Sequence, residues 1–141
     1  NTVFSDFWYD VPSHSLSKEE LDAWKTLIEI RNIANKKIEE IREKGEVGSS
    51  LQAELEIVAK PSIYKHLLSF QEDLKYIFIT SSVSIKEAEG ETKISDYASP
   101  HSKCDRCWHY AESVGSIKEH SNLCSRCYSN ISGQGELRVH A

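Results

Sequence analysis

The chain has 141 residues, of which 39% are hydrophobic and 28% charged, and its formal net charge is −5 at pH 7. No stretch approaches the roughly 20 apolar residues that a membrane-spanning helix needs, so the composition is that of a globular protein and argues against a membrane role. The N-terminus has no Met, no basic start and no apolar run of the kind a signal peptide carries. The chain is therefore interpreted as a piece of a longer protein.

The first sixteen residues are aromatic and irregular. They include Phe4, Phe7, Trp8, Tyr9 and Pro12. We expect this segment to be the end of an upstream domain that packs back onto the rest of the chain.

A long amphipathic helix is predicted over about residues 18–44. Ser17 is placed to cap it, and Glu20, three residues later, completes a capping box. Apolar residues then recur at three- and four-residue spacing, as on the buried face of a helix. This predicted stripe consists of Leu21, Trp24, Leu27, Ile28, Ala34, Ile38 and Ile41.

The next part predicts a mixture of helix and strand. Residues 54–59, ELEIVA, alternate apolar and polar side chains as a half-buried strand does, and Pro61 is placed at the first turn of a second helix that extends to Leu74. Residues 75–80 and 83–88 are predicted to pair as a hairpin, because both are rich in residues that favour strands. Residues 89–102 are interpreted as an irregular linker.

The predicted fold class is therefore α+β: a long helix with a small helix and strand unit, followed by a C-terminal four-cysteine zinc ribbon or finger. The predicted organisation has three parts, namely an upstream end at 1–16, an α+β unit at 17–98 and a zinc-binding module at 99–141.

The four cysteines have the spacing C-x2-C-x16-C-x2-C. A two-residue gap lets one tight turn aim both sulfurs at one metal ion, and the longer loop can bring the second pair opposite the first. Four thiolates suit Zn²⁺ and leave no open coordination position, which predicts a structural ion rather than a catalytic one. Two disulfides, a redox dithiol and an iron–sulfur cluster are the alternatives. The predicted ligands are Cys104, Cys107, Cys124 and Cys127.

The side chains beside these cysteines offer contacts for a partner. Trp108 follows Cys107 directly, so it is either an exposed platform on which unpaired bases stack or part of the small core of the module. Arg106 and Arg126 occupy matching positions inside the two turns, and both are predicted to point outward. His101, His109 and His120 are expected to donate to the metal ligands, to lie at the surface or to contact RNA, because four thiolates already complete the coordination shell.

Net charge gives no reason to expect broad electrostatic attraction to a polyanion. Residues 1–99 carry 12 Lys and Arg against 18 Asp and Glu, whereas residues 100–141 carry 5 against 4. Four thiolates around one divalent cation would add about −2 to the tail. Any contact with nucleic acid must then come from a few placed side chains.

Three stretches together resemble one family. KCDRCWHY, VGSIKEHSNLCSRCYSNISGQGELR and EVGSSLQAELEI are similar to the C-terminal end of bacterial-type isoleucyl-tRNA synthetases. The resemblance implies a parent enzyme that activates isoleucine with ATP and Mg²⁺ in the cytoplasm and transfers it to its tRNA. It also implies that this chain lacks the catalytic site, holds one zinc ion and helps to bind the anticodon end of the tRNA, with Trp108 and Arg106 at positions that meet the anticodon loop. Under this resemblance, residues 1–16 are the end of an upstream anticodon-binding domain.

Two other functions remain open at this point. The zinc segment is also similar, more loosely, to the zinc finger of formamidopyrimidine-type DNA glycosylases, which would make the chain a DNA-binding module. A zinc-stabilised domain that binds other proteins is the third possibility. The expected partners under the first interpretation are the isoleucine tRNA and the remainder of the synthetase chain.

Overall fold

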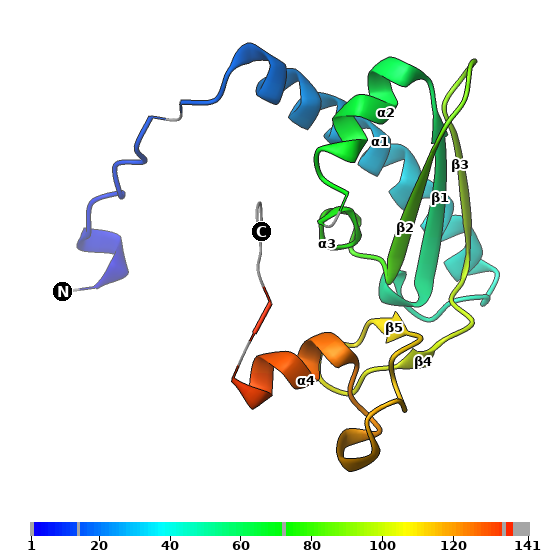
Figure 1. Cartoon of the computed structure of the whole chain (residues 1–141). Helices are drawn as coiled ribbons and strands as arrows, with labels where there is room; N and C mark the ends of the chain where they lie inside the picture. The colour runs from blue at the N-terminus through cyan, green and yellow to red at the C-terminus, as the bar shows by residue number, and fades with distance from the viewer. Residues whose placement is uncertain (1, 14, 72, 134, 137–141) are drawn as a thin grey trace.

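A computed structural model describes residues 2–13, 15–71, 73–133 and 135–136. Figure 1 shows an N-terminal segment that extends away from an α+β unit, and a small module with the C-terminal helix at one end of that unit. The segment begins with a short 3-10 helix, η1 (Val3–Ser5), and Phe4, Phe7 and Trp8 are each 97% exposed. The expectation that this segment packs back onto the following part is therefore wrong.

The long helix is confirmed as α1 (Lys18–Glu43). The Ser17 hydroxyl accepts a hydrogen bond from the Glu20 N–H at 3.2 Å, and the Glu20 carboxylate accepts one from the Ser17 N–H at 2.7 Å. Both halves of the predicted capping box are present. The predicted buried stripe wrongly includes Ile28, which is exposed, and omits Ala23 and Ile30, which are buried.

A three-stranded sheet with the order β2-β1-β3 forms the centre of the unit. β1 (Ala53–Ala59) follows a 3-10 turn, η2 (Ser50–Gln52). It pairs in parallel with β2 (Ser82–Glu87), so that Ile57 lies opposite Ile85, and antiparallel with β3 (Lys93–Ala98). The strand at 93–98 corrects the predicted linker.

Two helices connect β1 to β2. α2 (Pro61–Leu68) begins with Pro61 as predicted but ends six residues earlier than expected. α3 (Leu74–Phe78) occupies the segment that was predicted to be a strand. The predicted hairpin is therefore wrong: β2 pairs with β1, and the connection between these parallel strands is helical, as such crossovers usually are.

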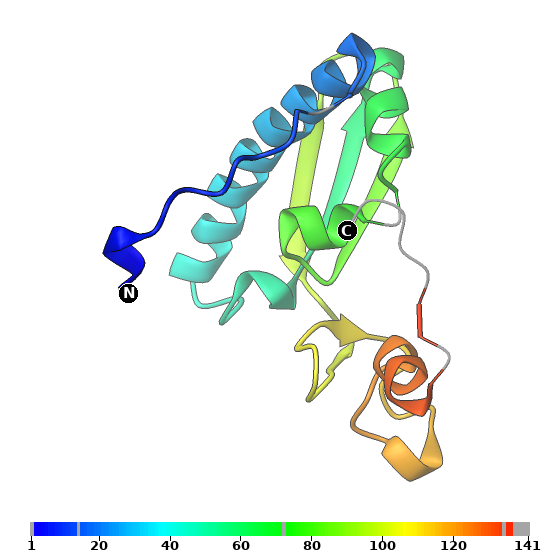
Figure 2. The same ribbon diagram turned by 90° about the vertical axis from the view of Figure 1, so that its left-hand side faces the viewer.

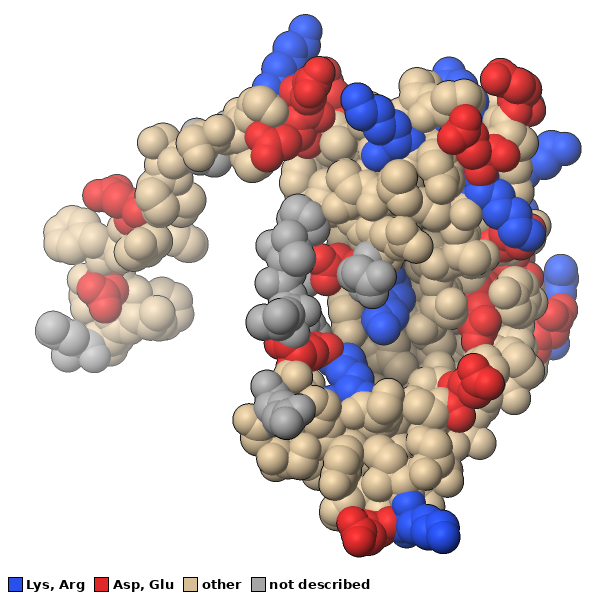
Figure 3. Space-filling model, viewed as in Figure 1, with Lys and Arg blue, Asp and Glu red and all other residues tan. Residues whose placement is uncertain are grey.

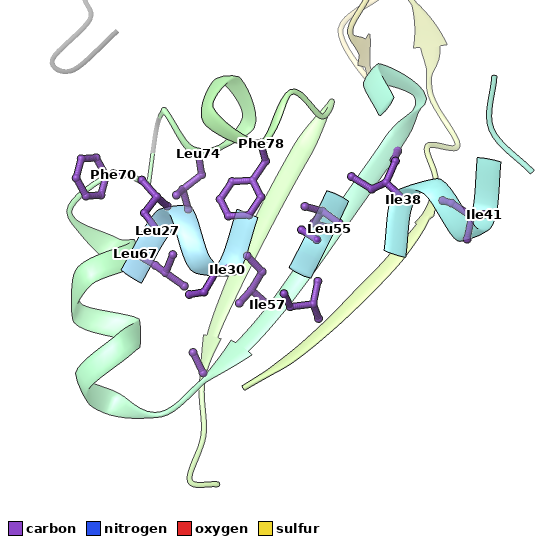
Figure 4. Close-up of a cluster of buried hydrophobic side chains, with 14 of the residues drawn as sticks. Leu27, Ile30, Ile38, Ile41, Leu55, Ile57, Leu67, Phe70, Leu74 and Phe78 are labelled. Carbon is purple, nitrogen blue, oxygen red and sulfur yellow. The ribbon is translucent and has the colours of Figure 1, made fainter. Parts of the chain in front are cut away.

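The core lies between the helices and one face of the sheet. Figure 4 shows Leu27 and Ile30 of α1, Ile57 of β1, Leu67 of α2 and Phe78 of α3 converging on this space. Trp24 and Phe70 add an edge-to-face ring contact with centroids 4.7 Å apart. Residues on the opposite face of β1, including Glu56, are less buried, so the unit has two layers.

The C-terminal module contains little regular structure. β4 (Ser102–Lys103) pairs antiparallel with β5 (Tyr110–Ala111), and then come a 3-10 turn, η3 (Lys118–His120), and α4 (Ser125–Ser132). Figure 2 shows this module beyond the end of the sheet, next to α3. Its position at the end of the sheet brings the cysteines close to α3.

Candidate metal centre

The first cysteine pair lies in the turn between β4 and β5. The Cys104 N–H donates to the His109 carbonyl at 2.9 Å, and the Trp108 N–H donates to the Cys104 carbonyl at 2.9 Å. These two bonds close the turn around the two sulfurs. Cys104 is fully buried, whereas Cys107 is partly exposed.

The second pair opens α4. Cys124 is the residue that caps the helix and Cys127 lies in its first turn, and both are buried. The Ser125 N–H donates to the Ser113 hydroxyl at 3.1 Å, which satisfies one of the free N–H groups at the start of α4. The helix therefore fixes the direction of both sulfurs.

Hydrogen bonds hold the two turns together. The Cys124 N–H donates to the Cys104 sulfur at 3.3 Å. On the outer side, the Asp105 N–H donates to the Asn122 carbonyl at 3.1 Å, and the Asn122 side-chain amide donates to the Asp105 carboxylate at 2.8 Å. The two cysteine pairs therefore face one another across a fixed distance.

The four sulfurs have the spacing of a tetrahedral metal site. All four cysteines are free thiols, and their sulfurs lie within 4.8 Å of one another. The sulfurs of Cys107 and Cys124 are 3.7 Å apart. Zinc–sulfur bonds of about 2.3 Å in a tetrahedron place the sulfurs about 3.8 Å apart, so the donor set and its geometry fit Zn²⁺. A closed shell of four thiolates makes the ion structural.

The sulfur environments differ in polarity. Burial alone would raise the pKa of Cys104, but the N–H groups of Cys107, Cys124 and Arg106 point at its sulfur and lower that pKa to about 6. Burial raises the pKa of the Cys124 thiol to about 12. Four ionised sulfurs therefore require a cation among them, and metal binding must release protons.

The two arginines lie against the cysteines instead of pointing freely outward. Arg106 is exposed as a residue, yet its guanidinium donates to the Cys127 sulfur at 3.7 Å. Arg126 pairs with the Glu136 carboxylate at 3.0 Å, and its side chain is only 22% exposed. The predicted outward orientation of Arg126 is therefore wrong, because this side chain lies between Glu136 and the ring of Tyr76.

Trp108 lies at the surface of the module. It is 59% exposed, its φ is 65°, and the ammonium of Lys103 lies 5.0 Å from the centre of its ring. The alternative in which Trp108 fills the core of the module does not agree with this exposure. The small core consists instead of the buried cysteines and Leu123, with Ala111 and Val114 against them.

The histidines lie outside the cluster of four sulfurs. His109 Nδ1 is 3.2 Å from the Cys107 carbonyl, and its ring meets the ring of Tyr76 edge to face at 5.7 Å. His120 packs against Tyr128 at 5.5 Å. Within the part of the chain that the structure describes, the groups that can hold a metal ion reduce to the four cysteines.

Tyr76 of α3 contacts the cysteine module, which the sequence did not reveal. Its ring meets His109, and the Arg126 guanidinium lies 5.2 Å from its centre. Ser81 adds a second link: it accepts from the Tyr110 N–H at 2.6 Å and donates to the Leu51 carbonyl. No local pattern in the sequence could have shown these contacts, because they join segments about thirty residues or more apart.

The two closed turns and the four-thiol site define a zinc finger. Residues 102–130 match the family described as the zinc finger found in FPG and IleRS. With the four clustered thiols, this match identifies the site as that of one structural zinc ion.

Over its whole length the chain is similar to isoleucine–tRNA ligases. It is 43% identical over 136 residues to the ligase of Chromobacterium violaceum, 44% over 148 residues to that of Nitrosomonas europaea and 40% over 143 residues to that of Cupriavidus taiwanensis. These alignments cover 95% to 100% of this chain but only 15% to 16% of each relative. The resemblance to the C-terminal region of bacterial-type isoleucyl-tRNA synthetases is thereby confirmed.

Among the described residues, no helix combines the length and the apolar character needed to cross a bilayer.

Proposed function

We propose that the chain is the noncatalytic, tRNA-binding C-terminal part of an isoleucine–tRNA ligase. In this proposal Cys104, Cys107, Cys124 and Cys127 bind the zinc ion, and Trp108 with Arg106 contacts the anticodon end of the tRNA. The attachment of isoleucine, with its need for ATP and Mg²⁺, occurs in the remainder of a cytoplasmic enzyme, to which residues 1–16 connect. The similarity to ligases over the whole chain supports this assignment over the DNA-glycosylase alternative.

The observation that carries the proposal is the exposed indole on a turn closed by metal ligands. Trp108 lies directly after the ligand Cys107, and the hydrogen bond from its N–H to Cys104 fixes its backbone. An aromatic ring that is already held in place loses little entropy when an unpaired base stacks on it. Lys103 beside the ring adds a positive charge that favours the phosphate groups of the same strand.

The charge distribution agrees with RNA binding through a few side chains instead of through a broad basic surface. Figure 3 shows acidic and basic side chains interspersed over the visible face instead of a continuous basic surface. The net charge of −5 gives no general attraction for RNA. Binding that depends on a few side chains predicts strong sensitivity to their removal.

The test measures binding of the zinc-loaded chain to isoleucine tRNA by gel mobility shift. We expect Trp108→Ala to weaken binding by roughly 5- to 150-fold, the range for loss of one stacked base. Trp8→Ala is the matched control, because it removes an even more exposed indole in the N-terminal segment, which extends away from the α+β unit (Figure 1). Zinc content by elemental analysis must stay at one ion per chain in both variants.

Three outcomes would contradict the proposal. They are equal binding of Trp108→Ala and the parent chain, equal loss in the Trp8→Ala control, and tighter binding to duplex DNA than to tRNA. The last result would favour the glycosylase-type function.

A further inference from the structure

The arginine of each cysteine turn lies near a cysteine of the other turn. Arg106 directly precedes Cys107, but its guanidinium donates to the Cys127 sulfur in the other turn at 3.7 Å. Arg126 directly precedes Cys127, but it lines one small hollow between α3 and the module together with Cys107 of the other pair. Each arginine therefore lies near the second cysteine of the opposite pair.

Positive side chains lie beside a negatively charged site. Four thiolates around one Zn²⁺ carry a net charge of −2, and the two guanidinium groups bring +2, part of which the Glu136 carboxylate offsets through its pair with Arg126. Three of the four cysteines are buried, and a buried charge is costly unless opposite charges or hydrogen bonds compensate it. Guanidinium groups remain charged in proteins and can donate to sulfur from several N–H groups.

The two arginines are held to different degrees. Arg126 pairs with Glu136 at 3.0 Å and lies 5.2 Å from the centre of the Tyr76 ring. It lines the same small hollow as Cys107, the one partly exposed cysteine of the four. Arg106 is an exposed residue, so solvent and salt screen its charge more strongly.

We propose that Arg106 and Arg126 retain the zinc ion by offsetting the negative charge of the four-thiolate site. Arg126 has the larger effect, because it is held by Glu136 and Tyr76 and lies beside the one partly exposed cysteine, which a competing chelator reaches first. Arg106 also belongs to the proposed tRNA contact, but zinc retention is measured without tRNA, so either proposal can fail alone.

The experiment follows transfer of zinc from the loaded 141-residue chain to excess chromophoric chelator. We expect Arg126→Gln to speed zinc loss and weaken zinc affinity by roughly 10- to 100-fold, the range for partners that contact metal ligands. Arg106→Gln has a smaller effect, which shrinks as salt rises. Arg126→Lys keeps the charge and recovers part of the retention.

Arg42→Gln is the matched control. Arg42 lies on α1 outside the cysteine module and pairs with the exposed carboxylate of Glu39 at 3.3 Å, so its loss removes the same charge without touching the zinc site and should leave zinc transfer unchanged. Zinc loss at the parental rate from both Arg106→Gln and Arg126→Gln, with one ion bound per chain at the start, overturns the proposal. If Arg126→Gln does not fold, unchanged zinc loss from Arg106→Gln at low salt overturns it as well.

Discussion

Trp108 has a backbone conformation that most residues avoid. Its φ of 65° lies in the left-handed region, where a side chain costs roughly 1–2 kcal/mol relative to glycine. Among the described residues, Ile79 at the end of α3 is the other non-glycine residue with a positive φ. A glycine after Cys107 would close the turn at lower cost, so the indole at this position is explained better by binding than by stability.

The free-energy cost of the left-handed backbone at Trp108 can be measured by comparing two substitutions of this residue. Trp108→Gly and Trp108→Ala both remove the indole and its contact with Lys103, but only glycine relieves the left-handed backbone. We expect the glycine variant to be more stable than the alanine variant by about 1 kcal/mol. Urea unfolding at saturating zinc measures the difference, and equal stability of the two variants would mean that this turn is not strained.

At the scale of single elements, local patterns predicted what local interactions determine. Ser17 and Glu20 fixed the start of α1 because a capping box needs only residues three apart. Pro61 fixed the start of α2 in the same way. Both features were visible in the sequence and both are confirmed.

Tertiary contacts decided the elements that were predicted wrongly. Residues 75–80 favour a strand by type, but Leu74 and Phe78 are both buried and four residues apart, which suits one helical turn against the core. Ile28 and Ile30 are equally apolar, but Ile30 continues the three- and four-residue spacing from Leu27 to Ala34, so this error lay in how the pattern was interpreted. Strand 93–98 buries Ile94 alone, which is too weak a pattern to predict from sequence.

The capping box also predicts a dependence of stability on pH. The Ser17 N–H, and then the Ser17 hydroxyl, lower the pKa of Glu20 below its ordinary value of 4.5. A carboxylate whose pKa is lowered on folding contributes stability above its unfolded pKa and loses it as the pH falls through the folded pKa. Unfolding measured between pH 7 and pH 2 should therefore show a contribution that declines below about pH 4.5 and is absent in Glu20→Gln.

Glu19→Gln is the control for this experiment. Glu19 lies in the same first turn but has no part in the capping box. If both variants reduce the loss of stability at acid pH equally, the cause is the negative charge at the start of the helix and not the hydrogen bond with Ser17.

At the scale of the whole molecule, two apolar clusters share no residue. The large one joins α1, the sheet and the crossover helices. The small one consists of Cys104, Cys124 and Cys127 with Leu123. Polar and ring contacts join the two parts, among them the hydrogen bond from the Tyr110 N–H to Ser81 and the ring contact of Tyr76 with His109.

The sequence predicted the metal ligands but not which side chains offset the negative charge of the four thiolates. The C-x2-C spacing is a local constraint, so the clustering of four sulfurs could be expected from the spacing alone. Packing of distant segments decides the contact of Arg106 with Cys127 and the contact of Arg126 with Tyr76 of α3. Contacts of this kind leave no periodic pattern in a single sequence.

Removal of zinc with excess chelator should unfold the module and leave the α+β unit folded. Four buried residues, three of them cysteines, cannot hold the module together without the ion, whose binding energy is its folding energy. Hydrogen exchange measures this directly: the amides of β1 should remain protected after chelation, whereas those of Cys104, Trp108 and Tyr128 should exchange rapidly. Loss of protection in β1 together with these amides would show instead that contacts such as Tyr76 with His109 make the chain one cooperative unit.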